Sequence, residues 1–211
     1  LDCERVQEAI DAMKTWMTEI KTCKDKDSLR GMEGVIARLY FSVLDELIVK
    51  QRDDFYFIER SKRPPMDRFN ALLSFFYAIL ANETAAALEG VGIDAYAGLF
   101  HTDRPGRASM ALDMIEEMRA FVVDKFCLSL VNLNRIDKRH FEVKENGACL
   151  LNDKGREIAL NQWNKRAQEE ITHPFTEEKI KLGLLPHVQA QLLNAYLRED
   201  IEAYPPFMMG G

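Results

Sequence analysis

Several features that mark particular protein classes are scarce in this sequence. Its four cysteines show neither the paired spacing of a zinc site nor the density of a disulfide framework, which favours a reducing compartment. The longest apolar run, about residues 71–81, falls well short of the ~20 residues needed to cross a bilayer, so no membrane association is expected. The first residues are charged and helix-patterned, which is not the pattern of a signal peptide.

An excess of positive charge is also absent, because 28 Lys and Arg residues face 34 Asp and Glu residues and give a net charge of −6. This balance excludes a positive field over the whole molecule, so nucleic-acid binding would need local basic patches. Between residues 60 and 139 the deficit disappears, with eleven basic residues against ten acidic ones. Any contact with nucleic acid is therefore expected in this part of the chain.

Apolar residues recur every three to four positions along most of the chain, which predicts a mainly helical fold of about seven or more helices. Asp67 is placed to cap a long, almost wholly apolar helix that ends at Gly90. One small β-hairpin is expected near residues 140–151, with Asn146-Gly147 at its turn.

The stretch 100–119, FHTDRPGRASMALDMIEEMR, combines a histidine, a basic turn and an acidic helix start. Asp113 and Glu116 are spaced i, i+3 and share one helical face, Ser109 is placed to cap the helix, and His101 lies upstream across a turn. A histidine beside clustered carboxylates can hold a divalent ion. The helix dipole also favours acidic residues in these turns, and a lone histidine near a turn is more often structural.

Two further groups of polar residues lie on otherwise apolar helical patterns. Glu33, flanked by two glycines, is expected to turn partly inward, where ionisation is costly without a partner. A surface glutamate fits this position equally well. Asn70, Ser74 and Tyr77 are spaced i, i+4, i+7 on the long apolar helix, so this polar seam either faces a site or makes ordinary buried hydrogen bonds.

Four stretches of the chain match a known family in order and spacing: GMEGVIARLYF, RSKRPPMDRFNALLSFFYAILANE, GLFHTDRPGRASMALDMIEEMRAFVVD and ITHPFTEEKIKLGLLPHVQAQLLNAYLREDIEAYPPF. Together they resemble the CRISPR-associated Cas1 family, with the subtype I-C branch closest in character. The resemblance covers nearly the whole chain. It implies a helical catalytic domain that cuts DNA and joins a 3′-hydroxyl to a backbone phosphate during spacer insertion in antiviral defence.

The resemblance also implies a metal site. The family holds a divalent ion on a glutamate, a histidine and a further acidic residue, which correspond here to Glu33, His101 and Glu116. Asp113 matches an additional acidic position that either binds the ion or orients a ligand. Two carboxylates and one imidazole suit Mg²⁺ or Mn²⁺, and Mn²⁺ is expected to serve better because Mg²⁺ prefers oxygen ligands. The polar seam would support this site.

Basic residues surround these positions in the sequence. The loop RSKRPP, residues 60–65, cannot continue a helix and presents three cations, although a solvated basic loop is the ordinary case. Neutralising the phosphate backbone supplies most non-specific DNA affinity. On this basis phosphate contacts are assigned, as a hypothesis, to Arg60, Lys62, Arg63, Arg104, Arg107 and Arg119.

For domain organisation, one domain is expected over residues 1–211, with a linker-like first helix at 1–27 and the catalytic core at 28–211. The N-terminal β-rich domain through which family members dimerise has no counterpart in the sequence. We therefore expect the C-terminal catalytic domain alone, and homodimer formation is left open. The resemblance implies DNA, double-stranded or branched, and Cas2 as partners, in the cytoplasm of a prokaryote.

A second hypothesis comes from another functional class: a helical DNA-binding or protein-interaction module whose carboxylates are solvated and which has no catalytic activity of its own. The positions of Glu33, His101 and Glu116 in space distinguish the two hypotheses, because a metal site requires all three around one point. The sequence suggests no role for His173 and His187.

Overall fold

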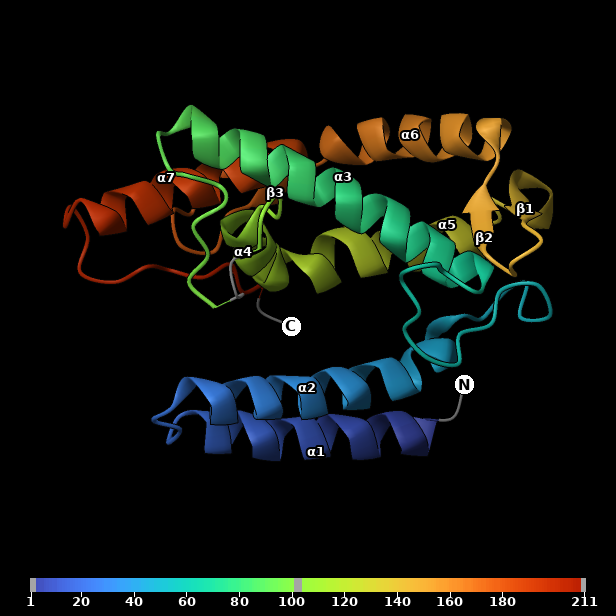
Figure 1. Ribbon diagram of the computed structural model, residues 1–211, viewed down its shortest axis with the longest axis horizontal. Coiled ribbons are helices and arrows are strands. Elements are labelled where there is room, and N and C mark those ends of the chain that lie inside the picture. The colour runs from blue at the N-terminus through green and yellow to red at the C-terminus, as the bar shows by residue number, and fades with distance from the viewer. Residues whose placement is uncertain (1–2, 101–103, 210–211) are drawn as a thin grey trace. The chain divides into compact units, whose positions relative to one another are not determined.

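The computed structural model describes residues 3–100 and 104–209 (Figure 1). The fold is mainly helical, which confirms the predicted fold class. Short 3-10 turns lie at Leu44–Leu47, Lys138–His140 and Leu182–Leu184, and a π-helical turn, η2, at Ala120–Asp124. Two antiparallel strand pairs are present, β1 (Phe141–Val143) with β2 (Cys149–Leu151) and β3 (Glu170–Thr172) with β4 (Lys179–Lys181). The helices are α1 (Cys3–Ile20), α2 (Lys26–Val43), α3 (Arg68–Gly90), α4 (Ser109–Arg119), α5 (Lys125–Asn132), α6 (Asp153–Ala167) and α7 (Leu185–Leu197).

The chain divides into two compact units. Unit 1 contains Leu1–Leu72 and Leu128–Asn152, and unit 2 contains Leu73–Cys127 and Asp153–Gly211. The predicted division into residues 1–27 and 28–211 stays a prediction. The four cysteines, all of which lie within the described residues, are free thiols.

In unit 1, α1 and α2 form an antiparallel helical pair (Figure 1). Asp25 caps the N-terminus of α2, where its side chain accepts a hydrogen bond of 2.8 Å from the N–H group of Ser28. Aromatic contacts anchor the connector that follows α2. The ring of Phe57 lies 5.7 Å from that of Phe41 on α2 and 6.0 Å from that of Phe69 in the first turn of α3. Aromatic contacts therefore hold the connector against both helices.

Helix α3 begins and ends where the sequence predicted. The carboxylate of Asp67 accepts a hydrogen bond of 2.7 Å from the N–H group of Asn70, and the helix ends at Gly90. By length and composition alone, α3 would pass for a membrane-spanning helix. Many of its large apolar residues are instead buried inside the protein, as in a core helix, while Phe75 and Ile79 are half-buried. The most completely buried of them are Phe69, Leu72, Leu73, Phe76 and Leu88.

The β1–β2 hairpin also agrees with the sequence. Phe141 pairs with Leu151, and the turn between the strands contains Gly147 at a φ of 80°. Glycine reaches this positive φ without the steric cost that a Cβ would add. The side chain of Asn146 accepts a hydrogen bond of 3.1 Å from the N–H group of Ala148, as expected for an Asn-Gly turn.

The core of unit 2 is built on aromatic rings from three helices. The ring of Phe76 on α3 stacks on Trp163 of α6 at 5.1 Å and meets Phe126 of α5 edge-on at 4.9 Å. These contacts hold the unit 2 part of α3 alongside α6, and the two helices run side by side in Figure 1. Close packing of this kind fixes the position of each helix.

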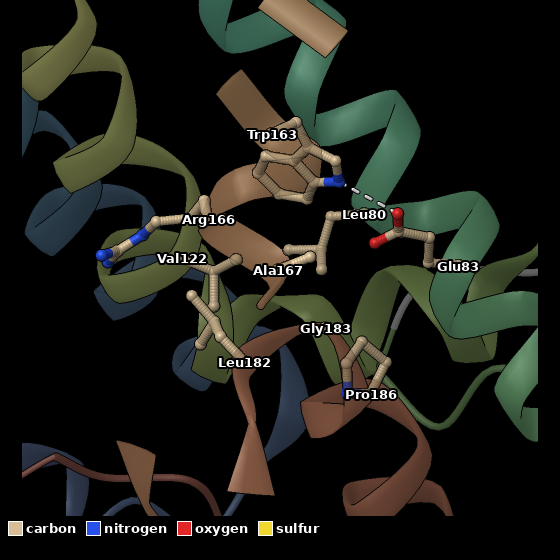
Figure 2. Close-up of a pocket in the computed structure, with 9 residues that line it drawn as sticks. All are labelled: Leu80, Glu83, Val122, Trp163, Arg166, Ala167, Leu182, Gly183 and Pro186. Carbon is tan, nitrogen blue, oxygen red and sulfur yellow. Dashed lines mark hydrogen bonds between the residues drawn. The ribbon is translucent and has the colours of Figure 1, made fainter. Parts of the chain in front are cut away.

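A small cleft opens beside this core (Figure 2). The indole N–H of Trp163 donates a hydrogen bond of 3.0 Å to Glu83 at its edge, while the guanidinium of Arg166 points away from it. A Cβ at Gly183 would lie only 2.9 Å from the Cβ of Ala167, so glycine permits the close approach of α6 to this turn. The apolar lining comes from Leu80, Val122, Trp163, Leu182 and Pro186.

Candidate metal centre

Helix α4, which carries the predicted acidic ligands, begins against a loop of unit 2. The carbonyl oxygen of Ala95 accepts hydrogen bonds from the N–H groups of Met110 (3.0 Å) and Ala111 (3.3 Å). Ser109 was predicted to cap this helix, and that prediction is wrong. Its buried hydroxyl donates to the carbonyl of Arg107 at 3.4 Å and makes no cap hydrogen bond. The loop carbonyl already satisfies the first-turn N–H groups, so a side-chain cap is unnecessary.

Asp113 holds the main chain that leads into the predicted histidine ligand. Its Oδ2 accepts hydrogen bonds from the N–H groups of Leu99 (2.7 Å) and Phe100 (2.8 Å). His101, the next residue along the chain, lies outside the described residues. Hydrogen bonds to a carboxylate are stronger than those between neutral groups. Asp113 thus fixes the backbone immediately before His101.

Glu116 binds a cation of its own helix. Two hydrogen bonds of 2.8 Å join Arg119 to the carboxylate, one from Nη1 to Oε1 and one from Nη2 to Oε2. The guanidinium also lies 5.4 Å from the centre of the Tyr77 ring, within the range of a cation–π contact. Arg119, which was assigned to phosphate, therefore neutralises Glu116 in unit 2.

Tyr77 connects this ion pair to a buried carboxylate. Its hydroxyl donates a short hydrogen bond to Asp124, which is only 1% exposed and is the last residue of the π-helical turn η2. Burial, followed by the negative charge of Asp124, raises the pKa of Tyr77 far above its ordinary value. Tyr77 thus stays a neutral donor at physiological pH and holds Arg119 from the α3 side.

In unit 1, the first residue of the predicted polar seam organises the basic loop. Asn70 is completely buried, and its Oδ1 accepts hydrogen bonds from Arg60 Nη1 (2.7 Å) and from the N–H group of Ser61 (3.1 Å). Its Nδ2 donates to the carbonyl of Glu59 at 2.8 Å and to Asp67 at 2.6 Å. Arg60 is therefore bound within the protein at the start of the loop.

The rest of the basic loop is closed by a hydrogen bond between its ends, and it faces solvent except at Pro65, which is buried. The N–H group of Met66 donates a hydrogen bond of 3.0 Å to the hydroxyl of Ser61, which joins the two ends of the loop. Lys62 and Arg63, between these ends, are exposed. The loop thus presents two cations on a fixed backbone.

The other residues that the sequence predicted for the site lie on the loop before α4, on α3 and on α2. Arg104 is exposed and Arg107 half-buried in the loop before α4, and Ser74 is half-buried on α3. Of the two positions considered for Glu33, partly inward or at the surface, the structure shows the second. Glu33 is exposed on α2, beside the half-buried apolar stripe of Met32, Ile36 and Leu39.

Glu33 belongs to unit 1 and Glu116 to unit 2, while His101 lies outside the described residues. Within residues 3–100 and 104–209, no three His, Cys, Asp or Glu side chains gather closely enough to hold a metal ion. The set of Glu33, His101 and Glu116 therefore stays a prediction.

The two histidines without a predicted role are placed differently. His187 is exposed, whereas His173 is completely buried. The Nδ1 atom of His173 accepts a hydrogen bond of 3.2 Å from the N–H group of Thr176, and its Nε2 lies 2.9 Å from Oε1 of Gln189. Both ring nitrogens are thus engaged inside unit 2, which gives His173 a structural role that no sequence pattern indicated.

Residues 2–165 match the protein family described as CRISPR associated protein Cas1. The chain belongs to the Cas1 family. It is 44% identical to a CRISPR-associated endonuclease Cas1 of Chlorobaculum tepidum, over 98% of this chain and 60% of that protein. A second Cas1, from Rhodospirillum rubrum, is 45% identical over 96% of this chain and 59% of its own length. A Cas1 of Leptospira interrogans is 39% identical over 96% of this chain and 80% of its own length.

Solved structures show the same Cas1 fold. A Cas1 protein from Thermotoga maritima matches with a TM-score of 0.78 at 25% identity, over 89% of this chain and 57% of its own. Two structures that are more distant in sequence also match. A partial Cas6-RT-Cas1–Cas2 complex gives 0.82 at 24% identity, over 99% of this chain and 61% of the other. A casposase bound to integration product gives 0.78 at 22% identity, over 97% and 61%.

Proposed function

We propose that this chain is the metal-dependent DNA endonuclease and integrase region of a Cas1 protein of the subtype I-C branch, which acts in CRISPR spacer acquisition. The observation that supports this most is its match, at 44% and 45% identity over nearly its whole length, to proteins named CRISPR-associated endonuclease Cas1. The chain spans about 60% of the length of these relatives. Glu33, His101 and Glu116 stand in the motifs that hold the ion in this family.

The donor set fits a divalent ion, Mg²⁺ or Mn²⁺. Two carboxylates and one imidazole give the mixed oxygen and nitrogen ligands that suit Mn²⁺, and they leave positions open for substrate and water. A bound ion would neutralise charge on the phosphate oxygens and activate the attacking hydroxyl or water. The carboxylate of Glu116 already binds a cation through both oxygens, as its pair with Arg119 shows.

The neighbours of these ligands have separate tasks in this proposal. Asp113 orients the histidine, because its carboxylate holds the N–H groups of the two residues that precede His101. Arg119 balances the charge of Glu116 when no metal is bound, and it turns to a DNA phosphate once a metal takes that carboxylate. The ring of Tyr77 contacts the guanidinium of Arg119 and keeps it within reach of Glu116 and of the DNA phosphate.

DNA binding is assigned to cations that are exposed or half-buried. Lys62 and Arg63 lie on the closed loop and make phosphate contacts, together with Arg104 and Arg107 before α4. Arg60 stabilises the loop through Asn70. Because related structures contain a Cas1–Cas2 complex and a casposase bound to integration product, we include Cas2 and branched DNA as partners. The proposed setting is the cytoplasm of a prokaryote.

The alternative is a helical DNA-binding or interaction module without independent activity. One observation favours it: the two exposed cations of the basic loop, Lys62 and Arg63, lie on a backbone that hydrogen bonds to Asn70 and Ser61 hold in place. The two functions separate in one experiment, in which branched DNA is incubated with the protein and Cas2, with Mn²⁺ or with EDTA. Cleavage or half-site integration that needs Mn²⁺ and is lost in Glu116→Ala supports the enzyme. Metal-independent DNA binding with no product under any condition supports the module.

A further inference from the structure

Glu117, the neighbour of Glu116 on α4, is held by three donors from distant parts of the sequence. Its Oε1 accepts hydrogen bonds from the hydroxyl of Tyr204 (2.5 Å) and from Nε2 of Gln189 on α7 (2.8 Å). Its Oε2 accepts a hydrogen bond of 2.9 Å from the N–H group of Phe207. Both oxygens of one side chain are thus engaged, and all of the groups lie in unit 2.

The network continues into the interior and fixes the orientation of Gln189. His173 accepts the N–H group of Thr176 on Nδ1, so its proton lies on Nε2 and is donated to Oε1 of Gln189 at 2.9 Å. The amide NH₂ of Gln189 must then face Glu117. Gln189 and His173 are both completely buried, and every member of a buried network of this kind needs its partner.

Residues 204–207 form a strap that returns to α4. After α7 the chain runs back toward α4, as Figure 1 shows. Phe207 is only 2% exposed, and its ring lies 5.9 Å from that of His173 and 5.6 Å from that of Phe121. Burial, followed by the charge of Glu117, raises the pKa of Tyr204 far above its ordinary value, so its hydroxyl stays a donor. The strap is therefore anchored by apolar contacts as well as by hydrogen bonds.

We infer that Glu117 is a positioning residue for Glu116, clamped by the 204–207 strap and Gln189. This inference rests on the proposed function. Successive side chains on an α-helix point about 100° apart, so a clamp at position 117 fixes the direction in which position 116 is presented. Groups that hydrogen-bond directly to a metal ligand orient it, and their loss typically weakens metal affinity about ten- to a hundredfold; Glu117 acts on Glu116 through the backbone of α4, so the lower end of this range is expected. The strap thus sets the affinity for the divalent ion without touching it.

The test measures Mn²⁺ dissociation constants by calorimetry, with the melting temperature of each metal-free variant beside them. Tyr204→Phe removes one donor with little change in volume, and Glu117→Ala removes the clamp. Tyr196→Phe is the matched control, because Tyr196 lies on α7 and is 42% exposed. We expect Tyr204→Phe to weaken Mn²⁺ binding about tenfold, Glu117→Ala at least as much, and Tyr196→Phe not at all.

The possible outcomes separate this inference from the proposed function. Should Tyr204→Phe melt at a lower temperature but bind Mn²⁺ with the affinity of the wild type, the strap is merely structural and the inference is wrong. This comparison remains decisive if Glu117→Ala does not fold. A wild-type protein that binds no Mn²⁺ overturns the proposed function itself, and the inference with it.

Discussion

Arg119 donates two parallel hydrogen bonds of 2.8 Å to Glu116, one to each carboxylate oxygen. The predicted acidic ligand is thus neutralised by a cation one helical turn away. Any divalent ion that binds Glu116 must compete with this guanidinium. The competition links the occupation of the metal site to the release of Arg119.

Replacing Arg119 should therefore tighten metal binding. The side chains of the pair are 27% and 34% exposed, and a partly exposed ion pair contributes up to about 1 kcal/mol, so Arg119→Met should lower the Mn²⁺ dissociation constant about two- to fivefold in the absence of DNA. Isothermal titration calorimetry measures the change. Arg139→Met, which breaks an exposed pair in unit 1, is the control. Unchanged or weaker binding in Arg119→Met contradicts the competition.

Removing the carboxylate of Asp113 should loosen the chain before His101. Asp113→Ala leaves the N–H groups of Leu99 and Phe100 without this acceptor and should cost about 1–3 kcal/mol of unfolding free energy. Asp113→Asn keeps a carbonyl oxygen and should cost less. Hydrogen exchange at these two amides measures the loss directly. Equal protection in Asp113→Ala and the wild type would show that the bonds do not hold this segment.

The predictions that succeeded rest on local chemistry. The limits of α3 follow from a capping aspartate and a terminal glycine, and the β1–β2 hairpin follows from its Asn-Gly turn. The β3–β4 hairpin was not predicted. Its strands, EIT and KIK, are three residues long, half of their residues are charged, and the positive φ in its turn belongs to Glu177 at 58° instead of a glycine. Pairing here depends on the surrounding fold.

The arrangement around the acidic residues could not be predicted for a different reason. Asp113 bonds to main-chain N–H groups, which every residue except proline carries, so no side-chain pattern reveals the contact. Glu117 meets Gln189 and the strap across 72 to 90 positions of sequence. Ser109 failed as a cap because a loop carbonyl took its place. Residue types thus indicated the chemistry, whereas the contacts follow from tertiary packing.

The salt dependence of DNA binding should report the number of phosphate contacts that the basic loop makes. Each phosphate contact adds about 0.9 to the slope of log K against log salt, so Lys62→Ala with Arg63→Ala should reduce that slope by about 1.8. Fluorescence anisotropy with duplex DNA at several salt concentrations provides the slopes. The control replaces two exposed lysines of α6, Lys154 and Lys165, with alanine. If the double variant gives the same slope as the wild type, the loop does not contact phosphates.

The carboxyl group of Asp137 should make part of the unfolding free energy depend on pH. The Arg139 side chain and the N–H group of Arg139 hold the pKa of Asp137 at about 2. Because this folded-state pKa is lowered, the stabilisation is present above about pH 4, the ordinary pKa of aspartate, and is lost as the pH falls through 2. After allowance for solvent screening, Asp137→Asn should cost about 0.5–1 kcal/mol at pH 7.

Urea denaturation of Asp137→Asn and the wild type at pH 7, 4 and 2.5 measures this effect. The difference in unfolding free energy should shrink steadily as the pH falls. A difference that is the same at all three pH values would mean that the charge of Asp137 contributes nothing.

The most direct test of the metal centre is the thermal melting of the protein with and without millimolar Mn²⁺. A metal ion that binds the folded state and not the unfolded chain stabilises the folded state, so the wild type should melt at a higher temperature when Mn²⁺ is added. We predict that Glu33→Ala, His101→Ala and Glu116→Ala each abolish this rise, while Asp153→Ala, an exposed change on α6, retains it. A rise of the same size in all three ligand variants and in the wild type would contradict the assignment.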